Sequence, residues 1–285
     1  MHSRVLVCAL ALSVFTLSAM QGHAADGLAY PDWKGQWTRF ITPGFGGQAS
    51  HDQTKPWGLG QEAPLTAQAR AILEASLADE AKGGLGNFPT ARCLPAGMPH
   101  MMMAFGPQEY VITPETTYIL INWDDHGRRI FTDGRGWPTD IEPSYAGYSI
   151  GRWLDPDGSG EASVLEAETR GPFKGPRAYD ATGLPLAFDN QSIFKERIHL
   201  DKADRNVLHD EMTVIDHALT RPWTVDKRYL RSSDPRPPWT EYYCGESNAQ
   251  VTIGKEHYFL SGDGTLMPTR EDQPPPDLRY FKKKP

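Results

Sequence analysis

The sequence predicts a mainly β fold, an antiparallel barrel with one helix near the N-terminus. From residue 109 onward, short extended runs alternate with turn-forming residues. Successive runs joined by short loops favour antiparallel pairing, and closure into a barrel removes exposed strand edges. One earlier segment, 66–82, instead carries apolar residues at helical spacing. A barrel of this size holds either packed side chains or one small ligand.

The first element is a predicted secretory signal peptide over residues 1–24. Arg4 supplies the positive charge, residues 5–19 form an apolar run, and small residues end at Ala24. Cleavage after Ala25 and an uncleaved anchor are the alternatives. The predicted cleavage site has no cysteine to which a lipid could be attached. The sequence after it contains no run of 18 apolar residues that would predict a membrane span. We therefore expect export to the periplasm or the medium, and no membrane span in the mature chain.

The helix follows an N-terminal stretch, 25–64, that is rich in Gly, Pro and Trp and holds one short predicted strand at 36–41. Thr66 can cap the helix, and Gly83-Gly84 ends it. Its apolar positions are Leu65, Ala69, Ile72, Leu73 and Leu77. We expect an N-terminal extension over 25–92 and a barrel domain over 93–285.

The barrel strands come next, and turn signals such as Asp133-Gly134 separate them. The predicted strands are 109–113, 116–123, 128–132, 148–154, 163–169, 192–200, 207–216, 223–231, 239–244 and 250–260.

Composition limits the function classes. The 285 residues are 39% hydrophobic and 23% charged, with a formal net charge of −7. This is typical of a globular protein, and the lack of a basic surplus argues against a nucleic-acid partner.

Two cysteines remain once Cys8 leaves with the signal peptide. Cys93 and Cys244 form an even pair in an oxidising compartment, which favours a disulfide. Such a bond would close a loop of about 150 residues and stabilise the fold by restricting the unfolded chain. Two buried free thiols are the alternative.

Four motifs carry a family resemblance. In chain order they are CLPAGMP (93–99), RRIFTDGRGWP (128–138), GYSIGRW (147–153) and TRPWT (220–224). Together they resemble an uncharacterised family of secreted bacterial proteins. The resemblance spans about half of the chain and implies secretion and a lipocalin-like (calycin-like) barrel, but it implies no substrate.

A polar hairpin offers the first candidate chemistry. Glu196 shares a strand face with Phe194 and Ile198, and a carboxyl in such apolar surroundings suits acid or base catalysis. On the next strand, His209 and Glu211 share a face. We take Glu196, His209 and Glu211 as candidate catalytic residues. The alternative is a solvated outer face with cross-strand ion pairs.

Arginines and aromatic residues that could hold a ligand gather between residues 128 and 153. Arginine pairs with carboxylates and stacks on aromatic rings. The alternative is an Arg–Asp network that braces the Asp133-Gly134 turn. The candidate substrate-binding residues are Arg128, Arg135, Trp137, Tyr145, Tyr148, Arg152 and Trp223.

Two patterns are weak metal candidates. Asp155, Asp157 and Glu166 have the spacing of an EF-hand calcium loop, but strands rather than helices flank them, and a hairpin turn explains the same residues. A second group, Met98, His100 and Met103, has ligands that suit copper, whereas methionine also fills irregular apolar space.

The expected function also depends on the catalytic and nucleotide-binding motifs that the sequence lacks. No G-x-S-x-G, H-E-x-x-H, P-loop or dinucleotide-binding motif occurs in the sequence. We expect an exported protein that admits a small hydrophobic or aromatic molecule and acts, without a cofactor, as an acid–base lyase, hydratase or isomerase. A non-catalytic carrier or sensor and a metal-binding protein are the alternatives.

Overall fold

A computed structural model describes residues 29–39, 51–52, 54–56, 58–103, 106–123, 126–240, 244, 250–260, 265–269 and 271–277. The predicted signal peptide lies outside these residues. Within them, no helix is long and apolar enough to cross a membrane.

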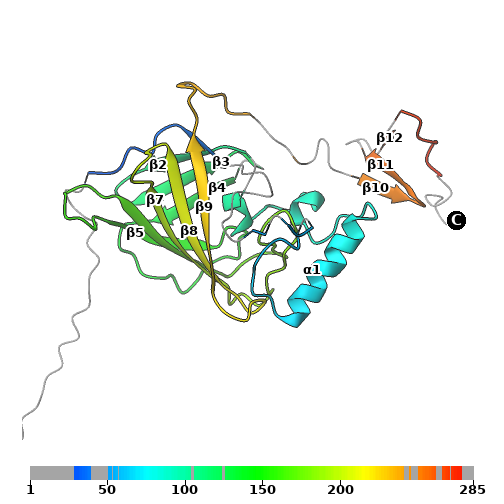
Figure 1. Ribbon diagram of the computed structural model, residues 1–285, viewed down its shortest axis with the longest axis horizontal. Helices are drawn as coiled ribbons and strands as arrows, with labels where there is room; N and C mark the ends of the chain where they lie inside the picture. Colours follow the sequence, from blue (N-terminus) through cyan, green and yellow to red (C-terminus); the bar gives the residue numbers. More distant parts are fainter. Residues whose placement is uncertain are drawn as a thin grey trace, which may run out of the picture.

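The predicted mainly β fold is confirmed. Nine strands form a closed barrel in chain order, and β1 pairs with both β2 and β9 (Figure 1). All neighbours are antiparallel except β4 and β5, which pair in parallel. The strands are β1 (Gln36–Arg39), β2 (Gln108–Ile112), β3 (Thr116–Ile121), β4 (His126–Phe131), β5 (Tyr148–Leu154), β6 (Val164–Arg170), β7 (Ile193–Leu200), β8 (Val207–Ile215) and β9 (Trp223–Arg231).

Strand alternation decides what the barrel encloses. Every second residue of β8 and of β9 is buried, which places Asp210 and Lys227 on the inner faces. On β7, Phe194, Glu196 and Ile198 point inward and are buried. The interior therefore combines apolar side chains with several charged ones.

The limits of the barrel differ from those expected. β1 comes from the stretch predicted as an N-terminal extension, because it fills the gap between β2 and β9. The chain after β9 forms a separate sheet of β10 (Gln250–Ile253), β11 (Glu256–Leu260) and β12 (Leu266–Pro268), which Figure 1 draws away from the barrel. The predicted strand 250–260 thus bends into a hairpin at Gly254, whose φ is +66°. Trp239 and Thr240, predicted to begin a strand, are not in one, and residues 241–243 lie outside the described residues.

The predicted helix is α1 (Ala67–Glu80). The side chain of Thr66 caps it by accepting a hydrogen bond from the Ala69 backbone N–H. Ala69, Leu73 and Ser76 form its buried face, whereas Ile72 is 42% exposed. The helix is joined to the barrel because the Thr66 N–H donates to the carbonyl of Ala218 between β8 and β9.

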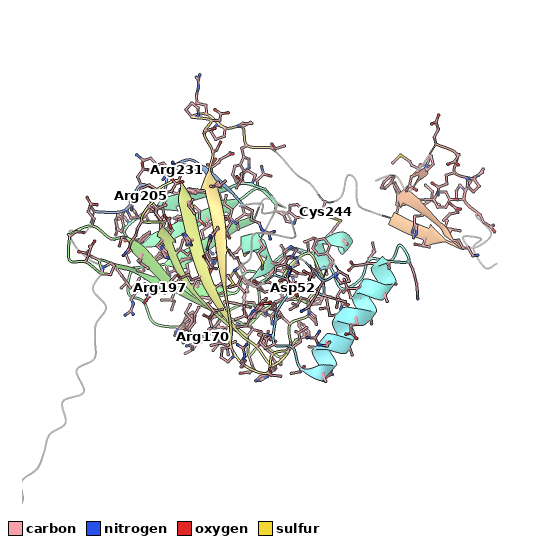
Figure 2. The ribbon with its side chains drawn as sticks, viewed as in Figure 1. Asp52, Arg170, Arg197, Arg205, Arg231 and Cys244 are labelled. Atoms are coloured by element: carbon pink, nitrogen blue, oxygen red, sulfur yellow. A yellow bond between two sulfur atoms is a disulfide. The ribbon has the colours of Figure 1, made fainter. Side chains whose placement is uncertain are left out.

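Different segments cover the two ends of the barrel. At one end lies the short 3₁₀ helix His100–Met103, which Arg39 and Tyr229 hold by donating to the carbonyls of Met103 and Met102. At the other end lies Arg231, which Figure 2 labels near the end of β9. Its guanidinium donates to the carbonyls of Lys34 and Asp32. This contact holds the segment that carries the buried Trp33.

Cys93 and Cys244 form a disulfide, as predicted, with a Cα–Cα distance of 5.4 Å. The bond joins residues 151 positions apart. It fixes Cys244, which follows the barrel in the chain, to the segment just before the 3₁₀ helix His100–Met103.

Candidate functional site

Two buried ion pairs lie inside the barrel, and they differ in how well they are satisfied. The first joins Arg128 on β4 to Glu196 on β7. Both terminal guanidinium nitrogens donate to the carboxylate, Nη1 to Oε1 at 2.8 Å and Nη2 to Oε2. Arg128 also donates to the hydroxyls of Ser149 and Thr169. These bonds link β4 to β5, β6 and β7 on the inside of the barrel and leave the Glu196 carboxylate engaged.

The second pair joins Asp210 on β8 to Lys227 on β9. Their closest charged atoms, Oδ2 and Nζ, are 3.7 Å apart, and both side chains are buried. The Lys227 ammonium donates to the sulfur of Met212 at 3.0 Å. Neither oxygen of Asp210 accepts a hydrogen bond from the part of the chain that the structure describes. A buried carboxylate without hydrogen bonds is costly, so this group is a candidate for function.

Burial changes the acidity of this pair. It raises the pKa of Asp210 to about 7, although the nearby Lys227 opposes the shift and Glu196 adds to it. Burial also lowers the pKa of Lys227, against the attraction of Asp210. A carboxyl with a pKa near 7 can both take and return a proton at neutral pH.

Buried tyrosines contribute to the surroundings of the pair, and the ring centroid of Tyr179 lies 5.9 Å from Lys227 Nζ. Tyr110 donates to the side-chain oxygen of Gln108 at 3.1 Å. Tyr179 packs on Trp223 with ring centroids 4.6 Å apart, and its hydroxyl has no hydrogen-bond partner among the described residues. Burial raises the pKa of Tyr110 and Tyr179 well above the usual value, which keeps both hydroxyls protonated.

A pocket of about 280 Å³ lies at the barrel end covered by Trp33. Tyr110, which is buried on β2, forms part of its lining. The other lining residues are Tyr30, Pro31, Asp32, Trp33, Lys34 and Ile112. Three aromatic residues, Tyr30, Trp33 and Tyr110, thus line the pocket.

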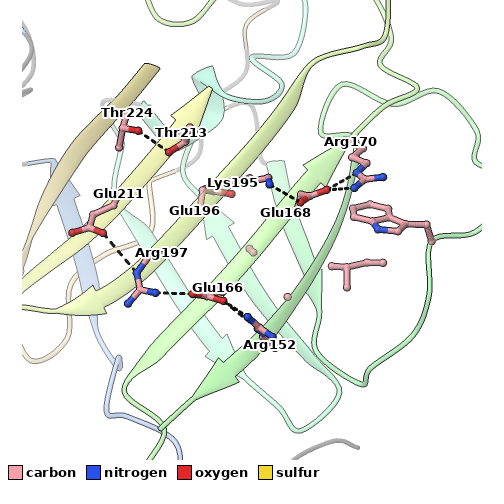
Figure 3. Close-up of a pocket in the computed structure, with 14 residues that line it drawn as sticks. Arg152, Glu166, Glu168, Arg170, Lys195, Glu196, Arg197, Glu211, Thr213 and Thr224 are labelled. Carbon is pink, nitrogen blue, oxygen red and sulfur yellow. Dashed lines mark hydrogen bonds and ion pairs between the residues drawn. The ribbon is translucent and has the colours of Figure 1, made fainter. Parts of the chain in front are cut away.

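A larger groove, of about 560 Å³, lies on the outer wall of the barrel. Side chains from β5 to β9 line it, together with Trp137 from the loop between β4 and β5 (Figure 3). Ion pairs run across the strands of this wall, with Arg197 bonded to Glu166 at 2.6 Å and facing Glu211 at 3.8 Å.

The three predicted catalytic residues are not brought together. Glu196 points into the barrel, whereas His209 and Glu211 point outward from β8. The His209 ring bridges two carboxylates, Asp226 at 2.9 Å and Asp201 at 3.3 Å. Glu196 and Glu211 both line the outer groove. Glu196 contributes only its backbone, because the Glu196 side chain is fully buried inside the barrel. His209 and Glu211 thus lie on an outer face with cross-strand ion pairs, which was the alternative to a catalytic role.

The predicted substrate-binding residues separate into several places. Arg135, Trp137 and Tyr148 gather outside the barrel, where Arg135 pairs with Asp133 and donates to the Tyr148 hydroxyl at 3.4 Å. This arrangement braces the Asp133-Gly134 turn. The remaining four lie elsewhere: Arg128 inside the barrel, Arg152 in the outer groove, Tyr145 beside Lys174, and Trp223 buried against Tyr179.

The residues with the spacing of an EF-hand loop take part in a turn and in ion pairs on the outer wall. Asp155 accepts backbone N–H bonds from Ser159 and Gly160 in a hairpin turn, and Asp157 accepts from Ser159. Glu166 instead binds Arg152 and Arg197 on the outer wall.

Met98, His100 and Met103 are all buried in the core. The His100 ring lies 5.2 Å from the Phe88 ring, and burial lowers the pKa of His100 to about 3. Among the described residues, no group of three or more His, Cys, Asp or Glu side chains could hold a metal ion.

Asp210, Lys227 and Tyr179 were not among the residues that the sequence analysis selected. A signal for the first two was present. Asp210 shares its face with Leu208, Met212 and Val214, and Lys227 lies between Val225 and Tyr229 at alternating positions. A single charged residue on an apolar strand face indicates a buried charge.

Comparison with known protein families and with curated proteins found no match for this chain.

Proposed function

We propose that this protein is exported and binds a small aromatic or hydrophobic molecule in its barrel, with Asp210 as the group that exchanges protons with it. One observation carries the proposal: Asp210 is a buried carboxylate that faces Lys227 and accepts no hydrogen bond from the described residues. This arrangement suits cofactor-independent acid–base chemistry, as in a lyase, hydratase or isomerase.

The class of molecule follows from the pocket at the Trp33 end. Tyr30, Trp33 and Tyr110 give it flat apolar walls, which suit an aromatic ring. The inner surroundings of Asp210 are buried, so an uncharged molecule enters at a lower desolvation cost than an ion. Trp33 and its segment cover this end of the barrel.

Each residue of the inner site has a defined role in the proposal. Asp210 removes a proton from carbon or oxygen and returns it to the product. Lys227, 3.7 Å away, stabilises the ionised carboxylate and any negative charge that develops on the substrate. Glu196 has no such role, because Arg128 engages both of its oxygens.

A nitrobenzisoxazole tests for such a base. In this aromatic, uncharged probe a base removes the ring C–H proton, the N–O bond breaks, and a coloured cyanophenolate forms. We expect turnover by the protein, and a loss of roughly 100-fold or more in Asp210→Asn, in the range of general base catalysis. The control is Glu211→Gln, one residue after Asp210 but on the outer face of β8.

The outcomes separate the candidates. Equal turnover in Asp210→Asn and the natural protein would refute the catalytic role of Asp210. Binding of N-phenylnaphthylamine, a neutral fluorescent aromatic, without any turnover would identify a carrier. Circular dichroism of each variant shows whether the barrel has folded.

Export is proposed from the predicted signal peptide, and the disulfide is compatible with an oxidising compartment. N-terminal sequencing of protein recovered from the periplasm and the medium tests it. A mature N-terminus at Ala25 is expected, and an intact Met1 in the cytoplasm would contradict export.

A further inference from the structure

The groove on the outer wall has a charge pattern that the proposed function does not use. Four cationic side chains, those of Arg152, Arg170, Lys195 and Arg197, and three carboxylates, those of Glu166, Glu168 and Glu211, line it. Ion pairs join all seven in two chains (Figure 3). The groove therefore offers hydrogen-bond donors and acceptors side by side, with its charges almost balanced.

This pattern selects the chemistry of a ligand. An anion would have to compete with the carboxylates that already bind the arginines. An apolar molecule would remove water from seven charged groups without replacing its hydrogen bonds, which is costly. A hydroxyl group both donates and accepts, so it can bridge a guanidinium and a neighbouring carboxylate.

Two further features suit a ligand rich in hydroxyls. Thr213 and Thr224 add hydroxyls at one side, with their oxygens 2.8 Å apart. Trp137 supplies an aromatic ring in the lining, and the Arg170 guanidinium, 4.5 Å from the ring centroid, holds it in place. The volume, about 560 Å³, lies within the range of small-molecule sites.

We propose that this groove binds a neutral, polyhydroxylated ligand, a short uncharged oligosaccharide. Hydroxyls of the sugar bridge Arg197 to Glu166 and Arg170 to Glu168, while a ring face contacts Trp137. The site lies on the opposite side of the barrel wall from Asp210, and it stands whether or not the interior is catalytic.

The test uses saturation-transfer NMR with maltotriose, cellotriose and chitotriose as separate probes. We expect transfer to at least one of them, and at least a tenfold weaker affinity in both Trp137→Ala and Glu166→Gln. Asp226→Asn, on the outer face of β9 but outside the groove lining, should bind as the natural protein does.

The comparison probe is trigalacturonate, an anionic sugar of the same length. Transfer to trigalacturonate alone, transfer to no neutral sugar, or binding unchanged in both groove variants would each overturn the proposal. A second experiment measures whether the protein sediments with insoluble cellulose or chitin. It distinguishes recognition of a free oligosaccharide from recognition of a polymer.

Discussion

Asp210 and Lys227 face each other across β8 and β9 inside the barrel, with 3.7 Å between Oδ2 and Nζ. Both side chains are buried, and the carboxylate accepts no hydrogen bond from the described residues. The pair differs in this respect from Arg128 and Glu196, whose polar atoms bind one another and two hydroxyls. This contrast is the basis on which we propose proton exchange at Asp210 and a bracing role for Arg128 and Glu196.

The stability of the protein should fall with rising pH because of Asp210. The unfolded chain loses this proton near pH 4, whereas the folded state keeps it up to a pKa of about 7. Between these values the folded state binds more protons, so the free energy of unfolding decreases as pH rises, by at most about 1.4 kcal/mol per pH unit. Urea unfolding at pH 5 and pH 7 measures the decrease, and Asp210→Asn should reduce it. An equal decrease in both proteins would contradict this.

Removing one partner of the bracing pair should be costly. Glu196→Gln leaves the buried Arg128 without its counter-charge, and we expect about 3–5 kcal/mol lower unfolding free energy. Glu211→Gln, on the exposed outer face, should change it by less than about 1 kcal/mol. Urea unfolding of both variants provides the measurement. A Glu196→Gln variant as stable as the natural protein would show that the pair is not a brace.

Reduction of the disulfide should destabilise the fold. Cys93 and Cys244 lie 151 residues apart, and the chain-entropy model gives about 5 kcal/mol for a loop of this length. Unfolding free energies with and without dithiothreitol measure the effect. The double variant Cys93→Ser, Cys244→Ser is the control, and it should be insensitive to the reductant. If the natural protein is equally insensitive, the bond has no part in stability.

Lys227 should set the pH at which the inner base works. Its positive charge opposes the rise in the pKa of Asp210, so Lys227→Met should move the midpoint of the pH–rate profile upward. Nitrobenzisoxazole turnover between pH 5 and 9 measures the shift. A midpoint equal to that of the natural protein would show that Lys227 does not influence the pKa of the group that removes the proton.

Much of the fold could be predicted from the sequence, because alternation and turn residues mark strands locally. Eight strand predictions correspond to β2 to β9, and Thr66 caps the helix as expected. The separate sheet of β10, β11 and β12 was not predicted, because alternation identifies a strand but not the sheet that it joins. The pairing of β1 with β9 depends on contacts almost 200 residues apart, which no local pattern records.

The candidate site differs from the one predicted from the sequence, and β8 shows why. Both of its faces carry polar residues, and the sequence does not state which face closure turns inward. His209 and Glu211 were selected because they share a strand face and could orient each other, yet that face points outward from the barrel. Asp210 stands alone among apolar neighbours, and its isolation on that face was the stronger signal.

The pH–rate profile of nitrobenzisoxazole turnover tests the role of Asp210 most directly. We predict a rate that rises with pH through a midpoint of about 7, the pKa to which burial raises this carboxyl. This profile should be lost in Asp210→Asn. A profile that persists unchanged in Asp210→Asn, or a midpoint near the ordinary carboxyl value of about 4, would contradict a buried base inside the barrel.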